Sequence, residues 1–285
     1  MSKFFNETLK ARNPRSPVVL TPDEAGAIRE KEPVPEPKAS ITDLGAFRLE
    51  NCRKLGLPLT DILHERFKGS TSLGTTEESY RALRTRLLRL RTAQGLRSVV
   101  VTSATQGEGK TLTSFNLALC CAQLQDMRVL LIDSDMRSRG LTRLLDSPAG
   151  PGLSDVLAEK CEPQDAILGT DCPNLYVMAS GSPSVPSAEF LASSRWQELI
   201  AWCNESFKVT LVDSPPVLNL SDVELITAGC DGVLMVVRAL HTKRDVLEKC
   251  SRQIDSKKLL GVVYNAAAGT NHEYNYSYGA SGKLG

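Results

Sequence analysis

The stretch SVVVTSATQGEGKT, residues 98–111, joins a short run of β-branched residues to a glycine-rich turn, and a helix-like segment, residues 112–125, follows it. This order is typical of a phosphate-binding loop, because glycines let backbone N–H groups converge on phosphate oxygens and the helix N-terminus adds partial positive charge. In such a loop Lys110 reaches the β- and γ-phosphates and the Thr111 hydroxyl binds Mg²⁺. A chance GEGKT turn on the surface would lack the strand and the helix on the correct sides. The sequence therefore predicts a nucleotide-binding loop made of Gln106, Gly107, Glu108, Gly109, Lys110, Thr111 and Leu112.

One position departs from the usual pattern of this loop. The first glycine of G-x-x-x-x-G-K-[ST] is replaced by Ala104. A methyl group is tolerated there only if the backbone does not take a positive φ. We therefore expect Ala104 to lie outside the left-handed region.

Further short apolar runs recur along the chain, with helix-like stretches between most of them. Short runs rich in β-branched residues, alternating with helices, are typical of parallel strands that are covered on both faces. The sequence therefore predicts a three-layer α/β fold with a mostly parallel sheet. The predicted strands are residues 98–102, 129–132, 175–178, 209–212, 233–237 and 261–264.

Aspartates follow two of these predicted strands directly. Asp133 and Asp135 come after residues 129–132, and Asp213 comes after residues 209–212, before a Pro-Pro turn. The carboxyl ends of parallel strands form the edge of the sheet where ligands bind. An aspartate after a strand is often only a helix cap. Three of them beside a phosphate loop favour metal binding and activation of a nucleophile.

Composition and charge narrow the class of protein. The chain has 285 residues, 41% of them hydrophobic, and a formal net charge of +1, which excludes a wholly disordered, fibrous or globally polyanion-binding protein. The longest strictly apolar run, residues 233–237, is far shorter than the ~18 residues that a membrane span requires. The N-terminus also lacks the apolar stretch of a signal peptide. We therefore expect a cytoplasmic protein.

The chain divides into three parts by composition. Residues 1–70 contain a Pro-rich stretch, residues 32–37, and are predicted to form a flexible, partly disordered arm or linker that contributes little to a core. Residues 71–268 carry the predicted strands and the phosphate loop. Residues 269–285 show no hydrophobic period and are predicted to be a flexible tail that contains tyrosines.

These motifs resemble those of the bacterial tyrosine kinase family, the P-loop autokinases of capsule and exopolysaccharide synthesis. The family has a second Walker motif, in which D-x-D-x-R follows three apolar residues. It also has a third Walker motif, in which D-x-P-P follows three apolar residues. Here the second motif is supplied by Asp133, Asp135 and Arg137, and the third by Asp213, Pro215 and Pro216. The resemblance covers about residues 77–278. Two positions differ, since Gln106 replaces a common proline and Ser138-Arg139 replaces the usual Arg-Pro.

The resemblance implies a P-loop NTPase fold that uses ATP and Mg²⁺, with catalytic residues at positions that match the family's motifs. It implies that Lys110 and Thr111 hold the phosphates and Mg²⁺. It implies that Asp213 positions the metal through water, and that Asp133 is a metal ligand that also orients or deprotonates an incoming phenol. Asp135 is expected to hold the metal or Lys110.

An arginine-rich stretch precedes the first strand. Glu78, Arg81 and Arg84 resemble the family's E-x-x-R-x-x-R oligomerisation motif, and residues three apart share one face of a helix. The same arginines could form a solvated face, or could contact DNA or anionic lipid as in the related ParA- and MinD-type ATPases. Those relatives carry a lysine at the loop position of Thr105, which favours subunit contact here.

The resemblance implies a tyrosine autokinase that phosphorylates Tyr274, Tyr276 and Tyr278 in trans within a ring-like homo-oligomer. The tyrosines could instead pack on one face of a terminal strand, but their Gly, Asn and Ser neighbours disfavour a strand. The resemblance also implies a separate membrane adaptor of the polysaccharide co-polymerase type, which would recruit the chain to the inner face of the plasma membrane. No nucleic acid partner is expected. The alternatives are a ParA/MinD-like positioning ATPase and a nucleotide-binding scaffold without catalysis.

Overall fold

The computed structural model describes residues 40–41, 44–48, 52–55, 58–59, 73–182, 187–219 and 222–266. These residues form an eight-stranded sheet with strand order β1-β4-β5-β3-β6-β2-β7-β8. Within it the β4–β5 pair is antiparallel and every other pair is parallel. The strands are β1 (Arg53–Lys54), β2 (Ser98–Ser103), β3 (Val129–Asp133), β4 (Ile167–Gly169), β5 (Leu175–Met178), β6 (Val209–Asp213), β7 (Gly232–Arg238) and β8 (Leu259–Asn265).

The mostly parallel sheet predicted from the sequence is confirmed. All six predicted runs form strands, with ends that agree within two residues. The two strands that the sequence did not predict, β1 and β4, have only two and three residues. Segments of that length are too short to show a hydrophobic period.

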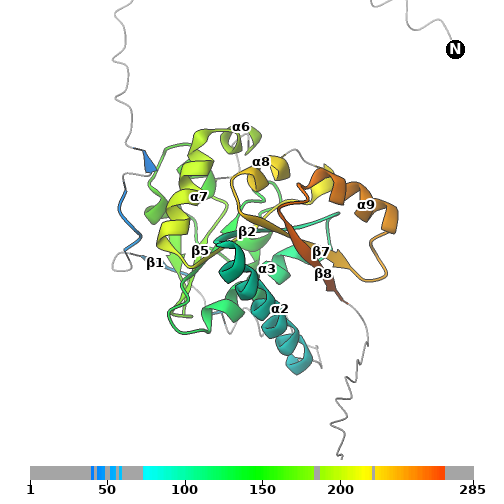
Figure 1. Ribbon diagram of the computed structural model, residues 1–285. Coiled ribbons are helices and arrows are strands. Elements are labelled where there is room, and N and C mark those ends of the chain that lie inside the picture. The colour runs from blue at the N-terminus through cyan, green and yellow to red at the C-terminus, as the bar shows by residue number, and fades with distance from the viewer. Residues whose placement is uncertain are drawn as a thin grey trace, which may run out of the picture. The chain divides into compact units, whose positions relative to one another are not determined.

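The central strands bury both of their faces, in two separate hydrophobic cores. In β2, Val99 packs with Phe115 of α3 (Lys110–Ala122), whereas Val100 packs in the other core with Trp196 of α7 (Ser194–Ser206). Figure 1 shows α7 and α8 on one side of the sheet and α2 and α3 on the other. The predicted three-layer arrangement is therefore confirmed. The remaining helices are α2 (Leu73–Gln94), α4 (Gly140–Leu144), α5 (Leu153–Leu157), α6 (Ser187–Leu191), α8 (Asp222–Ala228), α9 (Arg244–Gln253) and the 3-10 turns η4 (Pro163–Ala166) and η5 (Val217–Asn219).

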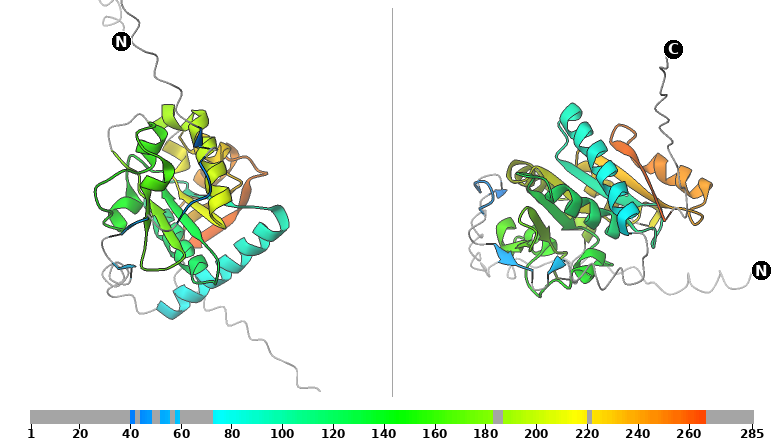
Figure 2. Two further views of the ribbon diagram at one scale, coloured as in Figure 1. Left: turned by 90° about the vertical axis from the view of Figure 1, so that its left-hand side faces the viewer. Right: turned by 90° about the horizontal axis from the view of Figure 1, so that it is seen from below.

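Helix α2 covers the outer side of α3 (Figure 2). Leu87 is buried in the core that Phe115 shares, and Arg84 Nη1 donates a 2.9 Å hydrogen bond to the Cys120 carbonyl near the end of α3. The helix on which the sequence places Glu78, Arg81 and Arg84 is thus present, and it is anchored to α3. In the part of the chain that the structure describes, no helix combines the length and the hydrophobicity needed to span a membrane.

Part of the predicted N-terminal arm packs into the domain. Ile41, Phe47 and Leu59 are at most 5% exposed, and β1 pairs with β4. The Phe47 ring lies 5.3 Å from the Tyr176 ring and 5.2 Å from the Phe207 ring, centroid to centroid. The expectation that residues 1–70 contribute little to a core is therefore wrong for these residues, because their partners lie far away in the sequence. The rest of this arm and the tail at 269–285 lie outside the described residues.

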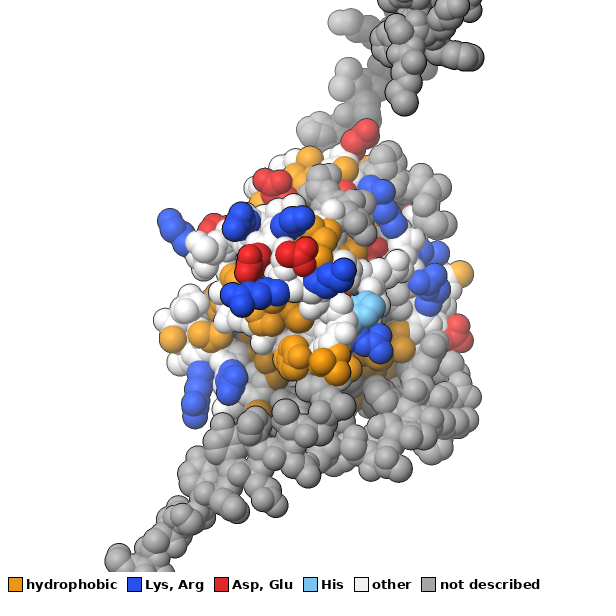
Figure 3. Space-filling view, turned by 90° about the vertical axis from the view of Figure 1, so that its right-hand side faces the viewer, with side chains coloured by type: hydrophobic (Ala, Val, Ile, Leu, Met, Phe, Trp, Pro, Cys, Tyr) orange, Lys and Arg blue, Asp and Glu red, His pale blue; other side chains and the backbone are white. Residues whose placement is uncertain are grey.

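The opposite edge of the sheet is formed by β8. Its Val262 and Tyr264 side chains are 53% and 61% exposed. Figure 3, which faces the side where β8 and α9 lie, shows hydrophobic side chains gathered among charged ones. This edge strand leads directly into the C-terminal segment.

Candidate active site

The phosphate loop connects the carboxyl end of β2 to the first turn of α3. Gly107 and Gly109 have φ values of 84° and 91°, in the left-handed region that favours glycine. A side chain at Gly109 would also collide with the Asn265 amide. Ala104 is buried and does not take a positive φ, which confirms that its methyl group is tolerated at the first glycine position.

Lys110 and Thr111 meet the carboxylates that follow β3 and β6. Lys110 Nζ lies 3.1 Å from Asp135 Oδ2 and 3.9 Å from Asp213 Oδ1. The Thr111 hydroxyl donates a 2.8 Å hydrogen bond to Asp213 Oδ2, and Ser114, one turn later, donates one of 3.2 Å to Asp213 Oδ1. Since β3, β6 and β2 are adjacent and parallel, their carboxyl ends bring these groups together, as the sequence predicted.

Burial dominates the electrostatics of this cluster. It raises the pKa of Asp213 to about 7, although the Lys110 ammonium opposes the shift. Burial alone would also raise the pKa of Asp135, but Lys110 and the hydrogen bonds from Ser138 outweigh it, so that this pKa is lowered. Lys110 therefore pairs with an ionised Asp135, while Asp213 is poised to exchange a proton for a cation.

Asp133 is turned toward the loop that follows β3. It is fully buried, and its Oδ2 accepts hydrogen bonds from the Thr142 N–H at 2.8 Å and the Thr142 hydroxyl at 2.7 Å. Its Oδ1 accepts a longer bond of 3.3 Å from the Asp135 N–H. Burial raises the pKa of Asp133, and the Thr142 hydrogen bonds lower it in part. The roles of Asp133 as proton acceptor and metal ligand stay predictions.

Thr142, which donates to Asp133, and Ser180, which contacts Thr142, were not predicted from the sequence. The Thr142 hydroxyl lies 3.0 Å from the Ser180 hydroxyl and accepts a hydrogen bond from the Ser180 N–H. Both residues belong to no recognised motif, and Ser180 lies 38 residues from Thr142. Only the folded chain brings them to the site.

The Ser138-Arg139 departure from the family pattern changes the backbone that this loop can adopt. Arg139 has a φ of 50°, which proline cannot adopt because its ring fixes φ near −65°. The Arg139 Nε–H instead donates a 3.0 Å hydrogen bond to the Ser180 hydroxyl. In this conformation the loop carries an arginine contact where the family usually has a proline.

The donor set around Thr111 fits Mg²⁺. The Thr111 hydroxyl and the Asp213 carboxylate supply adjacent oxygen atoms, which is the ligand type that Mg²⁺ prefers. Among the described residues, no group of three or more His, Cys, Asp or Glu side chains could hold a metal ion. Mg²⁺ is usually held by one or two protein ligands, and phosphate oxygens and water complete its coordination.

The other predicted site residues lie apart from this cluster. Gln106 and Leu112 are exposed at the loop and on the first turn of α3. On α2, Arg81 pairs with Glu77 at 2.6 Å and with Glu78 at 3.5 Å in its own helix. The predicted acceptors Tyr274, Tyr276 and Tyr278 lie outside the described residues.

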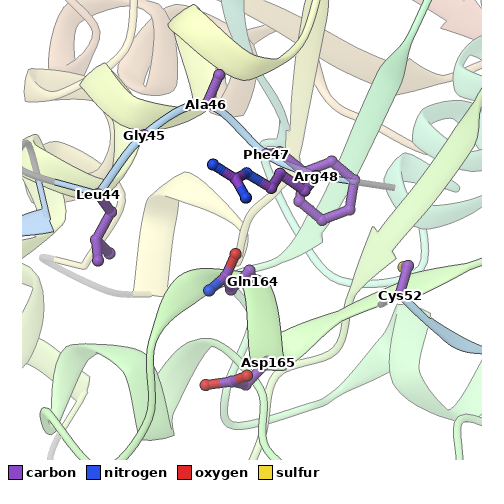
Figure 4. Close-up of a pocket in the computed structure, with 8 residues that line it drawn as sticks. All are labelled: Leu44, Gly45, Ala46, Phe47, Arg48, Cys52, Gln164 and Asp165. Atoms are coloured by element: carbon purple, nitrogen blue, oxygen red, sulfur yellow. The ribbon is translucent and has the colours of Figure 1, made fainter. Parts of the chain in front are cut away.

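A separate cavity of about 340 Å³ lies near the β1 edge of the sheet (Figure 4). In the sheet, β5, β3 and β6 separate β4 from β2 and its phosphate loop. The cavity is therefore no part of the phosphate site. It is lined by Leu44, Gly45, Ala46, Phe47, Arg48, Cys52, Gln164 and Asp165.

Comparison with known proteins agrees with this geometry. A family profile described as an AAA domain matches residues 96–257. The chain is 32% identical over 203 residues to the tyrosine-protein kinase YwqD of Bacillus subtilis, covering 70% of this chain and 85% of that protein. It is 31% identical over 214 residues to the tyrosine-protein kinase CpsD of Streptococcus agalactiae, covering 74% and 90%. The solved kinase domain of the Escherichia coli tyrosine kinase ETK superimposes with a TM-score of 0.64 at 27% identity, over 80% of this chain and 89% of that domain.

A glycine-rich loop between a central parallel strand and a helix, with Lys110 and Thr111 facing Asp213, defines a P-loop nucleotide-binding protein. Within this class, the second and third Walker motifs and the long matches to tyrosine-protein kinases identify the family. The chain belongs to the bacterial tyrosine kinase family.

Proposed function

We propose that this chain is an ATP-dependent protein-tyrosine autokinase, which transfers the γ-phosphoryl group of ATP to Tyr274, Tyr276 and Tyr278 of its own C-terminal segment. The observation that carries the proposal is the cluster of Lys110, Thr111 and Asp213 at the mouth of the phosphate loop. Membership of the family supports tyrosine as the acceptor.

The cluster suits phosphoryl transfer because the transition state of that reaction requires positioning and charge neutralisation more than covalent help. The loop N–H groups and the Lys110 ammonium bind the phosphate oxygens of ATP. Asp135, 3.1 Å from Lys110 Nζ, holds the ammonium at the loop before ATP enters. Thr111 and Asp213 would hold Mg²⁺, which neutralises phosphate charge when bound.

The phenolic proton requires an acceptor, since the ordinary pKa of tyrosine is ~10. Of the two aspartates after β3, Asp133 has the raised pKa and is the stronger base, whereas the pKa of Asp135 is lowered. Among the residues that the structure describes, only the Asp135 N–H donates to Asp133 Oδ1, at 3.3 Å. We therefore assign this oxygen the proton that leaves the phenol as the new O–P bond forms and ADP departs.

The proposed function also includes assembly of the chain into a homo-oligomer. The C-terminal segment of one subunit reaches the phosphate loop of a neighbour in a ring-like homo-oligomer, with Glu78, Arg81 and Arg84 of α2 at the subunit contact. The family resemblance supports a role in capsule or exopolysaccharide synthesis, in the cytoplasm. It also supports a separate membrane adaptor of the polysaccharide co-polymerase type that recruits the kinase to the membrane.

Mapping of phosphate by mass spectrometry tests the function directly. The purified chain is incubated with ATP and Mg²⁺, beside a variant in which all three predicted acceptors are changed to Phe. A Tyr264→Phe variant is the matched control, because Tyr264 is an exposed tyrosine that precedes the C-terminal segment. We expect phosphotyrosine in the wild type and the control and its loss in the triple variant. ATP hydrolysis without phosphotyrosine would instead support a positioning ATPase, and unchanged phosphotyrosine in the triple variant would exclude these acceptors.

A further inference from the structure

The Glu108 side chain turns away from the phosphate side of the loop and into the protein. It is fully buried. Its Oε2 accepts a 3.2 Å hydrogen bond from the Ala104 N–H, and its Oε1 accepts bonds of 3.3 Å from the Thr105 N–H and 2.8 Å from the Thr105 hydroxyl. The carboxylate therefore closes the loop on itself, between its fifth and first residues.

Residues at or just after the ends of β7 and β8 form hydrogen bonds with Gly107 and Glu108 of the loop. The Thr242 hydroxyl, in the turn after β7, donates a 2.9 Å hydrogen bond to Glu108 Oε1. Asn265, the last residue of β8, donates one of 2.8 Å from Nδ2 to the Glu108 carbonyl. Arg238, at the end of β7, donates one of 3.2 Å to the Gly107 carbonyl. These partners come from 131 to 157 residues further along the chain.

A carboxylate in a phosphate loop needs a physical reason, because an acidic group that faced the nucleotide would repel its phosphates. Here the Glu108 carboxylate accepts hydrogen bonds from four donors, which hold its charge inside the protein. The loop also contains Gly107 and Gly109, and glycine loses more conformational freedom on ordering than any other residue. Contacts that order the loop before ATP arrives lower the cost of bringing its N–H groups together.

We infer that Glu108 is a positioning residue that preorganises the phosphate loop, and that Thr242 and Asn265 hold Glu108 in that role. The inference rests on nucleotide binding by this loop, as in the proposed function. It assigns Thr242, which lies outside the recognised motifs, a part in ATP affinity. It also makes Asn265 a direct link between the loop and the start of the C-terminal segment.

Thr242 offers the cleanest test because it is half-buried and can be changed conservatively. Thr242→Val removes the donor with little change of shape, and Thr242→Ser keeps a hydroxyl. Thr92→Val is the control, since Thr92 is exposed and its hydroxyl donates to the Leu88 carbonyl within α2. Affinity for a fluorescent ATP analogue with Mg²⁺ is measured on the full chain. We expect Thr242→Val to bind roughly tenfold more weakly, the scale for one lost hydrogen bond to a charged group, and the other two variants to bind as the wild type does.

Kinetics separate positioning from a merely structural role. Lys110 and Asp213 are untouched by Thr242→Val, so we expect the KM for ATP to rise while kcat changes little. A structural defect would instead lower the melting temperature and the active fraction, with KM unchanged. Equal nucleotide affinity in the wild type and Thr242→Val would overturn this inference and leave the proposed function standing. A wild-type chain that binds no nucleotide would overturn the proposed function, and this inference with it.

Discussion

The Thr111 hydroxyl donates a 2.8 Å hydrogen bond to Asp213 Oδ2, across 102 residues of sequence. Ser114 engages the other carboxylate oxygen, so both oxygens of Asp213 face the first turn of α3. Burial makes this carboxylate resist ionisation even though the Lys110 ammonium lies 3.9 Å from its Oδ1. The hydrogen bond from Thr111 thus marks the place where Mg²⁺ exchanges with a proton.

The first prediction is that Mg²⁺-dependent nucleotide affinity increases as the pH rises from 6 to 8. Mg²⁺ requires the ionised carboxylate, and burial raises the pKa of Asp213 from 3.8 to about 7. Titration calorimetry with an ATP analogue at several pH values measures the affinity. In Asp213→Asn the pH-dependent component should disappear, and the same slope in both proteins would contradict the assignment.

The second prediction is that the free energy of unfolding of the nucleotide-free chain falls as the pH rises from about 4 to about 7. Over that window the native state holds a proton on Asp213 that the unfolded state has released, because the native pKa is the higher one. Above pH 7 this contribution levels off. Thermal unfolding across the window measures it, and the difference between wild type and Asp213→Asn isolates the one group. A difference that does not vary with pH would exclude the raised pKa.

The third prediction is that Lys110→Met lowers phosphotyrosine formation by ~10²–10³-fold, the scale for loss of one preorganised charge-stabilising group. Lys110 is only 8% exposed, and its removal leaves the ionised Asp135 without the ammonium that lies 3.1 Å away. We therefore also expect a lower melting temperature. Lys160→Met is the control, because the side chain of Lys160 is 59% exposed. A well-folded Lys110→Met chain with near-normal turnover would exclude this loop as the active site.

Local patterns predicted the parts of the site that adjoin strands. The loop and Asp213 could be placed because a β-branched run, a glycine turn and the rule on strand ends are all readable within a few residues. Asp133 was predicted as a residue of the site, but its orientation toward Thr142 could not be. That orientation depends on a loop whose Arg139 adopts a left-handed backbone, and no local signal indicates it.

Long-range partners explain what the sequence could not predict. The Glu108 side chain is oriented by Thr242, 134 residues away, and Phe47 is buried by aromatic residues that follow it by more than a hundred positions. A short apolar patch in a Pro-rich segment resembles a linker until such partners are known. Tertiary contacts, and not propensity, decide these positions.

The fourth prediction concerns that patch. Phe47→Ala should lower the free energy of unfolding by about 3–5 kcal/mol, the range for truncation of a buried Phe, since Phe47 is 5% exposed among Tyr176, Trp202 and Phe207. Denaturant unfolding measures the change. Nucleotide affinity should be unaltered, because Phe47 packs on Phe207, which precedes β6, whereas Asp213 lies at the opposite end of that strand. Leu240→Ala, at a fully exposed leucine, is the control and should change stability by less than ~0.5 kcal/mol. A Phe47→Ala chain as stable as this control would show that the segment is not docked.

The last prediction separates the two arginines of the α2 motif. Arg84 donates to the Cys120 carbonyl of its own chain, so its removal disturbs α2 as well as any interface. Arg81 pairs with two exposed glutamates of its own helix, Glu77 and Glu78, and such pairs stabilise a helix by only ~0.3–0.5 kcal/mol. Arg81→Ala should therefore reduce the assembly measured by light scattering without lowering the melting temperature, because a ring repeats the same contact at every subunit. Arg244→Ala removes a comparable pair with Glu248 on α9 and should leave the assembly intact. If the assembly survives Arg81→Ala unchanged, this face of α2 is a solvated surface.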